Sequence, residues 1–488
     1  DKWGGDWNRR LEFIRQLLSK MREAVGDYPI CCRVAGDEFM EGGYTLDDFC
    51  KYIAPVMEES GCDMFDVTCG VFEHFTSVIP EMYEPRGVWS YMPEAIKKVV
   101  SVPVAGLGRI NDGRLAVKMI EDGIFDIVGI GRGSVADPEF ARKTLAGRYD
   151  DIRQCIACNN CFEDDLSNRP SRCAVNFEYD RDSEWEEERM LSTKKKQDIL
   201  VAGGGPAGME FARVATLRGH KVTICEKKDK LGGYLPLAAN YPRLNTRELL
   251  NIIRWLKKEI NSLGIKVEFQ TEVTEDLIQE RKPDAVVLAT GSAEVIPDIP
   301  GINGPNVVTL DAYLSGKKTV GKRVVIIGGN YGAEVAVSLG REGKKMPEPG
   351  YKKYHLPFEK RVLQATNPEK VKEVTILESG PIVGWPPYSF IMRYIVINEA
   401  LAEAGVQCLT QVSVKEITDG FVSYVGSDGK EATVPYDTLI VAVGRVAKRD
   451  LYRQLAGKVV PVWEIGDCTG PEKIRKAIHT ANFAARQI

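Results

Sequence analysis

Short apolar runs alternate with longer amphipathic stretches along the first 150 residues. The apolar runs are typical of buried parallel strands and lie at 28–34, 64–70, 102–110 and 125–133. The amphipathic stretches have helical spacing and lie at 7–25, 46–60, 92–100, 113–122 and 137–146. This order predicts repeated β/α units, as in an α/β barrel or an open parallel sheet.

Glycine and arginine residues gather where three of these strands are predicted to end. They are Arg33 on the first strand, Gly106, Gly108 and Arg109 on the third, and Gly131 and Arg132 on the fourth. In barrels the functional groups collect at the carboxyl ends of the strands. Glycine lets a phosphate approach the backbone, and a guanidinium neutralises its charge. Two adjacent strands with both residue types therefore predict a phosphate site.

Four cysteines in the next segment have the spacing C-x2-C-x2-C-x11-C, at Cys155, Cys158, Cys161 and Cys173. Zinc ribbons usually use two C-x2-C pairs that are well separated. Three cysteines at successive short spacings and a distant fourth are typical of ferredoxin-like loops. We expect a [4Fe–4S] cluster, with zinc as the alternative. The other cysteines lie mostly on strand-like runs, which fits a reducing compartment better than an oxidising one.

Residues 198–227 read as a strand, a glycine-rich turn, a helix and a second strand. Gly203, Gly205 and Gly208 fit the G-x-G-x-x-G pattern, in which the glycines allow a tight turn, approach of a pyrophosphate and close helix packing. The pyrophosphate is expected at the helix N-terminus. Glu226 ends the second strand, where a carboxylate binds ribose hydroxyls. We therefore predict a dinucleotide site.

Later segments indicate FAD in this first site and a second dinucleotide site further on. Gly233 lies in "LGG", and the backbone of Val273 in "EVT" would face an adenine. The second glycine-rich turn, with Gly328 and Gly332, is one residue shorter than usual, and a polar insertion at 346–371 follows it. Glu378 ends the next strand and favours NADH over NADPH, because a carboxylate repels a 2′-phosphate.

The overall composition narrows the class of partners. The net charge of −4 indicates no nucleic acid and no membrane surface as a partner, and no apolar run reaches the length of a membrane span. We expect a small-molecule substrate and a cytoplasmic protein, and the sequence leaves a homo-oligomer open.

The amino-terminal segments resemble the second half of an old yellow enzyme barrel. The resemblance rests on "DKWGGDWNRRLEFI", "CRVAGDEF", "GLGRIND" and "IVGIGRGSVADPEF". "GRYDDIRQCIACNNC" then resembles the iron–sulfur branch of that family, which contains 2,4-dienoyl-CoA reductase, 2-enoate reductases, bile-acid enoyl reductases and trimethylamine dehydrogenase.

This resemblance implies cofactors and site residues. It implies FMN, with Arg33 at the N1/C2-carbonyl edge of the flavin, and with Arg109, Gly131 and Arg132 at its phosphate. It also implies that His74, which lies before Ile79-Pro80, donates a proton to the substrate as a catalytic residue. The carboxyl-terminal "VWEIGDCTGPEKIRKAIHTANF" resembles the flavin motif of two-dinucleotide flavoproteins, in which Asp467 would bind the ribityl chain of FAD.

The predicted fold is α/β: the carboxyl-terminal half of a TIM (β/α)8 barrel, a [4Fe–4S] loop, and a two-dinucleotide-binding FAD/NAD(P) module. A closed barrel needs eight strands and about 250 residues. Because only four units are found here, we expect the amino-terminal half of the barrel to be absent from this chain. The predicted domains are 1–150 (FMN barrel), 151–175 (cluster), 176–197 (linker), 198–320 with 440–488 (FAD) and 321–439 (NAD(P)H).

These predictions favour an NADH-dependent reductase of an activated C=C bond in an unsaturated acid, thioester or ketone. Electrons would pass from NADH to FAD, through the cluster to FMN, and then to the substrate. One alternative is a trimethylamine-dehydrogenase-like enzyme that passes electrons outward to an external flavoprotein. A second alternative is an electron-transfer subunit without its own substrate site.

Overall fold

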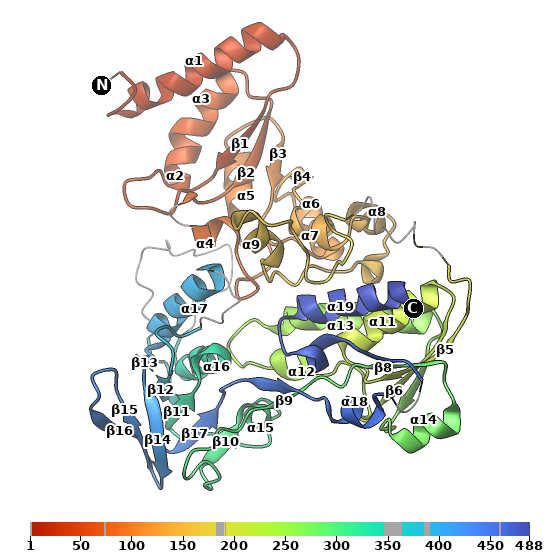
Figure 1. The fold of residues 1–488 in the computed structure, drawn as a ribbon. Coiled ribbons are helices and arrows are strands. Elements are labelled where there is room, and N and C mark those ends of the chain that lie inside the picture. Colours follow the sequence, from red (N-terminus) through yellow and green to blue (C-terminus); the bar gives the residue numbers. More distant parts are fainter. Residues whose placement is uncertain are drawn as a thin grey trace. The chain divides into compact units, whose positions relative to one another are not determined.

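The computed structural model describes residues 2–72, 75–181, 190, 192–345, 364–384, 391–457 and 460–488. These residues form two compact units, which are considered separately (Figure 1). The first comprises residues 2–157, and the second comprises the described residues from Cys158 onward. The boundary between the units therefore falls inside the cysteine segment.

The first unit is a four-stranded parallel sheet with helices between its strands (Figure 1). Its strands are β1 (Cys31–Ala35), β2 (Met64–Thr68), β3 (Val104–Gly106) and β4 (Ile127–Val128), in the order β1-β2-β3-β4. Its α-helices are α1 (Trp7–Val25), α2 (Leu46–Asp48), α3 (Ala54–Glu59), α4 (Phe75–Val78), α5 (Tyr91–Lys97), α6 (Gly113–Glu121), α7 (Arg132–Ala136) and α8 (Phe140–Leu145). Consecutive parallel strands joined by helices confirm the predicted β/α order.

Local sequence signals account for several of these elements. The side chain of Asp6 caps α1 by accepting the N–H of Arg9 at 3.2 Å, and α1 ends before Gly26, whose φ of 59° favours glycine. The predicted helix at 46–60 consists of α2, a π-helical turn at Phe49–Ile53 and α3. Arg33 is the third of five residues in β1, because the strand continues to Ala35.

The second unit contains two parallel sheets of five strands. The first sheet has the order β19-β8-β5-β6-β7. It consists of β5 (Asp198–Ala202), β6 (Lys221–Glu226), β7 (Lys266–Phe269), β8 (Ala285–Leu288) and β19 (Val462–Glu464). Helices α11 (Pro206–Leu217), α13 (Leu250–Ser262) and α19 (Ile474–Gln487) lie side by side on one face (Figure 1). Helices α12 (Leu235–Ala238), α14 (Glu275–Arg281) and α18 (Asp450–Leu455) complete this module.

The second sheet repeats this arrangement with the order β10-β17-β11-β12-β13. Its strands are β10 (Val307–Thr309), β11 (Arg323–Ile327), β12 (Glu373–Leu377), β13 (Gln407–Leu409) and β17 (Thr438–Val441). Its helices are α15 (Leu310–Leu314), α16 (Gly329–Gly340) and α17 (Ile391–Ala404). A three-stranded antiparallel sheet adds β14 (Ser413–Thr418), β15 (Phe421–Val425) and β16 (Glu431–Pro435).

Two short strands form a ribbon between the two modules. They are β9 (Ser292–Glu294) and β18 (Arg445–Ala447), which pair in antiparallel register. β9 follows β8, a strand of the first sheet, and β18 follows β17, a strand of the second sheet. The chain therefore crosses between the modules twice at one place.

Among the helices that the structure describes, none combines the length and apolar composition of a membrane-spanning segment.

Candidate functional site

A cavity of about 570 Å³ lies in the first module of the second unit, at the carboxyl ends of its strands. Volumes of this order are typical of small-molecule and cofactor sites. Six of the residues that sequence reasoning assigned to FAD line it: Gly203, Gly205, Glu226, Gly233, Val273 and Asp467. These residues span more than half of the chain length in sequence and converge because they lie at or after the carboxyl ends of β5, β6, β7 and β19, which are strands of one parallel sheet.

In the glycine-rich turn between β5 and α11, each glycine has a different structural reason for lacking a side chain. Gly203 has a φ of 113°, in the region that favours glycine. A Cβ on Gly208 would lie 1.9 Å from the carbonyl oxygen of Gly203, so α11 packs on the turn without room for a side chain. A Cβ on Gly205 would meet only the Cα of Gly233, at 3.6 Å, and would project at the cavity wall. The chain therefore presents bare backbone where a pyrophosphate would bind.

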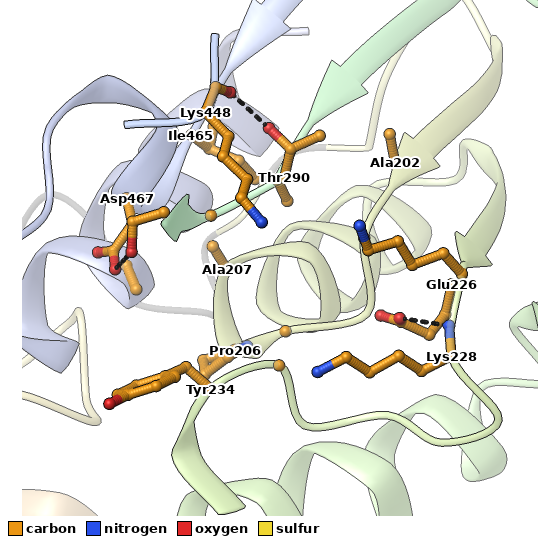
Figure 2. A pocket seen from close by; sticks show the side chains of 18 of the residues that line it. Ala202, Pro206, Ala207, Glu226, Lys228, Tyr234, Thr290, Lys448, Ile465 and Asp467 are labelled. Atoms are coloured by element: carbon orange, nitrogen blue, oxygen red, sulfur yellow. Dashed lines mark hydrogen bonds between the residues drawn. The ribbon is translucent and has the colours of Figure 1, made fainter. Parts of the chain in front are cut away.

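One end of the cavity carries Glu226 and two lysines. Glu226 is buried, and its carboxylate accepts the N–H groups of Gly204 at 2.8 Å and Lys228 at 2.9 Å. Figure 2 shows the Lys228 side chain beside Glu226 and the Lys448 side chain beside Thr290, all on the cavity wall. Burial lowers the pKa of Lys448, and the nearby cations Lys227 and Arg445 act in the same direction. This end can bind a ribose with adjacent negative charge.

The other end of the cavity is formed by Asp467 and Tyr234 (Figure 2). Burial raises the pKa of the Asp467 carboxyl, while hydrogen bonding by the Glu472 N–H and by Ser292 opposes that rise. Ser292 Oγ donates to Asp467 Oδ2 at 3.2 Å. Ile474 and Ala477, at the start of α19, line the same wall. The cavity therefore runs from Glu226 to Asp467 and the start of α19.

The second glycine-rich turn reproduces the first in its hydrogen bonds. Gly328 has a φ of 97°, and the N–H of Gly329 donates to Glu378 Oε2 at 2.6 Å, as that of Gly204 does to Glu226. The shortened loop shows in the helix start, since α16 begins at Gly329, directly after Gly328. A Cβ on Gly332 would lie 2.6 Å from Ile326, so this glycine serves packing. The predicted insertion falls largely in 346–363, outside the described residues.

The cysteine segment is divided between the two units. Cys155 belongs to the first unit, and Cys158, Cys161 and Cys173 belong to the second. Cys155 Sγ accepts the N–H of Ala157 at 3.3 Å, and Ala157 has a positive φ. Among the residues that the structure describes, no group of three or more metal-ligating side chains forms a metal site. The geometry therefore does not demonstrate the predicted cluster.

A short helix that the sequence did not indicate, α9 (Asn160–Leu166), begins within this segment. Within the second unit, α19 holds the segment by three contacts. Lys473 Nζ lies 3.2 Å from Glu163 Oε2, and Arg475 Nη1 donates to Asp164 Oδ2 at 2.5 Å. The Nε2 atom of His479 is 2.8 Å from the carbonyl oxygen of Cys173. Burial lowers the pKa of His479 to about 4, so its ring is neutral at neutral pH.

In the first unit, the arginines at the strand ends contact a single loop. Arg109 Nη1 donates to the carbonyl of Met82 at 3.3 Å, and Arg132 Nη1 donates to that of Pro80 at 2.9 Å. β3 and β4 are neighbours, as the predicted phosphate site requires. A Cβ on Gly131 would meet no atom within 4 Å, so its backbone is open to a ligand. This arrangement fits a phosphate group.

Other predicted residues of the first unit have more local roles. A Cβ on Gly106 would lie 2.3 Å from the Phe125 ring, so packing excludes a side chain there. Gly108 has a φ of 120°, in the region that favours glycine, and a Cβ on it would lie 2.8 Å from Trp89. Arg33 Nη1 lies 3.3 Å from Asp66 Oδ2 on the neighbouring strand. His74 lies outside the described residues.

Sequence reasoning missed several residues that line the cavity. They are Lys228, Tyr234, Ser292, Asp311, Arg445 and Lys448. The sequence held a signal for two of these residues. Ser292 in "ATGS" and Arg445 in "AVGR" stand at equivalent positions after β8 and β17 in the two modules.

Comparison with known proteins gives two family matches and close relatives along the whole chain. Residues 1–151 match the NADH:flavin oxidoreductase / NADH oxidase family, and residues 197–485 match the pyridine nucleotide-disulphide oxidoreductase family. A metal reductase of Desulforamulus reducens is 35% identical over 510 residues, with 99% of this chain and 72% of the relative covered. A cinnamate reductase of Clostridium sporogenes is 28% identical, with 100% and 70% covered.

A solved structure resembles the same stretch. The 2-naphthoyl-CoA reductase in complex with 2-naphthoyl-CoA has a TM-score of 0.87 and 32% identity, with 100% of this chain and 70% of that chain covered.

Proposed function

This chain belongs to the iron–sulfur flavoprotein branch of the old yellow enzyme family and is a flavin-dependent oxidoreductase; from that premise we propose that it uses NADH to reduce an activated C=C bond. The substrate class is an unsaturated acid, thioester or ketone. The relatives named for cinnamate and 2-naphthoyl-CoA reduction support this class, because both names denote conjugated carboxyl compounds.

The observation that carries the proposal is the extent of the dinucleotide cavity. The same cavity wall includes Glu226 at one end and Asp467 with the start of α19 at the other. A site that bound only ADP, without a flavin, would need only the Glu226 end of the cavity. A cavity that continues to Asp467 supports a complete FAD, which accepts two electrons as a hydride and passes them on singly. An FAD beside an NADH module favours inward electron flow, and therefore reduction of the substrate.

The preference for NADH rests on Glu378. Its carboxylate occupies the position in the second module that Glu226 occupies in the first, next to the glycine-rich turn. A fixed negative charge there attracts ribose hydroxyls and repels a 2′-phosphate. We therefore propose NADH as the electron donor, with NADPH a much weaker one.

On the substrate side, Arg109, Arg132 and Gly131 would hold the phosphate of FMN, and Arg33 would lie at the ring edge. Arg33 lies on β1, Arg109 follows β3, and Gly131 and Arg132 lie where α7 begins after β4, so all four belong to the β/α units of one sheet of the first unit. His74 is the proposed proton donor to the substrate α-carbon. We propose the electron order NADH, FAD, cluster, FMN and substrate.

A spectroscopic titration without oxygen tests this function. NADH is expected to bleach the flavin absorption of the purified protein, NADPH is expected to do so far more slowly, and cinnamate or an enoyl-CoA is expected to restore it. Bleaching by a tertiary amine with no response to NADH would contradict the proposal and favour the outward, amine-oxidising alternative. Bleaching by NADH that no unsaturated acid, thioester or ketone reverses would favour an electron-transfer subunit.

The proposed ligands of a [4Fe–4S] cluster are Cys155, Cys158, Cys161 and Cys173, and this assignment rests on their spacing and on the family. When bound, such a cluster transfers single electrons between the flavins. The Cys158→Ala variant is expected to lose most of the iron and sulfide, because a cubane needs four thiolate ligands.

The measurement is elemental analysis of iron, zinc and acid-labile sulfide per chain. The matched control is Cys408→Ser, since Cys408 is an exposed cysteine outside the segment. Stoichiometric zinc in the unaltered protein, with no sulfide, would contradict the cluster.

A further inference from the structure

The guanidinium of Arg445 holds together the flavin end of the cavity. Its Nε donates to Ser292 Oγ at 3.0 Å, and its Nη2 donates to the Ser292 carbonyl at 3.1 Å. Its Nη1 donates to Asp311 Oδ1 at 2.9 Å. The guanidinium carbon lies 4.0 Å from the centre of the Tyr234 ring, and 9% of the side chain is exposed. One cation is thus fixed by three polar atoms and an aromatic face.

These contacts determine which group donates in the hydrogen bond between Ser292 and Asp467. A serine hydroxyl has one proton, and an arginine side chain only donates. Because Ser292 Oγ accepts from Arg445, its proton is directed to Asp467 Oδ2, 3.2 Å away. One oxygen of Asp467 is thereby engaged, and the carboxylate is held in one orientation. Asp467 is the residue expected to hydrogen-bond the ribityl chain.

The same contacts cross between the two dinucleotide modules. Ser292 begins β9 and Arg445 begins β18, and the two strands pair in antiparallel register. Asp311 lies on α15 of the second module, and its N–H donates to Glu294 Oε1 of β9 at 2.7 Å. The ribbon that joins the modules is therefore locked at the point where it touches the cavity.

We infer that Arg445 is a positioning residue for FAD, which orients Asp467 through Ser292 and fixes this orientation to the second module through Asp311. The inference rests on the proposed FAD site. It requires the forked geometry of arginine, because the compact ammonium of a lysine does not reproduce the planar set of donors that reaches both Ser292 and Asp311.

The test compares the variants Arg445→Met, Arg445→Lys and Ser292→Ala. The first readout is the ratio of FAD to FMN that each purified protein retains. The second is the concentration of added FAD that restores the ratio of the unaltered protein. FMN in the same sample is the internal reference. We expect both Arg445 variants to bind FAD roughly 10- to 100-fold more weakly, since hydrogen bonds of a charged group are lost. Ser292→Ala interrupts only the relay to Asp467, so we expect a loss of roughly 3- to 10-fold with an unchanged melting temperature of the FAD-free protein.

The matched control is Arg449→Met, because Arg449 forms an ion pair with Glu464 and its side chain is 45% exposed. Its FAD-to-FMN ratio is expected to equal that of the unaltered protein. Normal FAD affinity in Ser292→Ala and Arg445→Met would overturn the inference. Full rescue by Arg445→Lys would also overturn it, because charge alone would then suffice. An unaltered protein that contains no FAD would instead overturn the proposed function.

Discussion

The Gly205→Ala variant is expected to fold normally and to lose FAD, whereas Gly208→Ala is expected to fold poorly. Both glycines belong to one turn, and both substitutions add a single methyl group. Their surroundings differ: a Cβ at 208 would lie 1.9 Å from a backbone oxygen, and a Cβ at 205 would have its nearest neighbour at 3.6 Å. The methyl group at position 208 would therefore clash with the protein backbone, and the methyl group at position 205 would clash with the bound cofactor.

The conformation of each residue supports this contrast. Gly205 has a φ of −76° and a ψ of −177°, which alanine adopts without strain. The added methyl would displace the pyrophosphate from the backbone N–H groups at the start of α11, and we expect FAD affinity to fall roughly tenfold or more. At Gly208 the helix must move away from the turn, and overpacking of this kind costs about 3 kcal/mol or more.

Two measurements on each variant check this prediction: the melting temperature of the FAD-free protein and the ratio of FAD to FMN in the purified protein. The expected pattern is a normal melting temperature with a low ratio for Gly205→Ala, and a lowered melting temperature for Gly208→Ala. If Gly205→Ala retained FAD in full, the turn would not be the pyrophosphate site. If Gly208→Ala were as stable as the unaltered protein, the close packing of α11 would be wrong.

The elements of the fold were predictable from sequence where the signal is local. The helix predicted at 7–25 is found at Trp7–Val25, because its apolar spacing, its Asp6 cap and Gly26 all act within a few residues. The four strands of the first unit were found for the same reason, although β3 and β4 are shorter than their apolar runs. The apolar positions of those runs outside the two strands lie in the segments on either side of them.

The site was predictable only in part, because long-range contacts have weak sequence signals. The glycines and acids of the two turns follow strands at fixed offsets, so Gly203 and Glu226 could be found from spacing. Arg445 contacts Ser292 across 153 positions, and no local pattern indicates that contact. In the first unit, Gly106 and Gly108 have packing reasons that a pattern of glycines cannot reveal, and their place in a phosphate site stays a prediction.

The second large effect is expected at a buried ion pair on α11. Replacing Glu210 by alanine is expected to destabilise the second unit by about 3–5 kcal/mol, because the buried guanidinium of Arg213 loses the carboxylate that accepts from two of its nitrogens. Glu210 and Arg213 are 2% and 1% exposed. Arg213 Nε donates to Glu210 Oε2 at 3.0 Å and Arg213 Nη2 donates to Glu210 Oε1 at 3.1 Å.

This pair also joins α11 to α19, and so links the two helices that begin at the cavity. Asn482 Nδ2 donates to Glu210 Oε1 at 2.7 Å, and Arg486 Nε donates to Asn482 Oδ1 at 2.7 Å. Loss of Glu210 therefore removes an acceptor of Asn482 Nδ2 as well as of the two Arg213 nitrogens. A double variant, Glu210→Leu with Arg213→Leu, removes both charges together and is expected to be more stable than Glu210→Ala, since apolar packing replaces an ion pair at little cost.

The measurement is the urea midpoint of each variant, followed by circular dichroism, with Lys221→Ala as the control for an exposed pair. Lys221 pairs with Asp198, and the two side chains are 78% and 46% exposed, so its loss is expected to cost less than about 1 kcal/mol. A double variant less stable than Glu210→Ala would contradict the explanation, because the destabilisation would then arise from lost contacts of the side chains. The expected order, with the single variant least stable, would show that removing one partner of this buried ion pair is the cause.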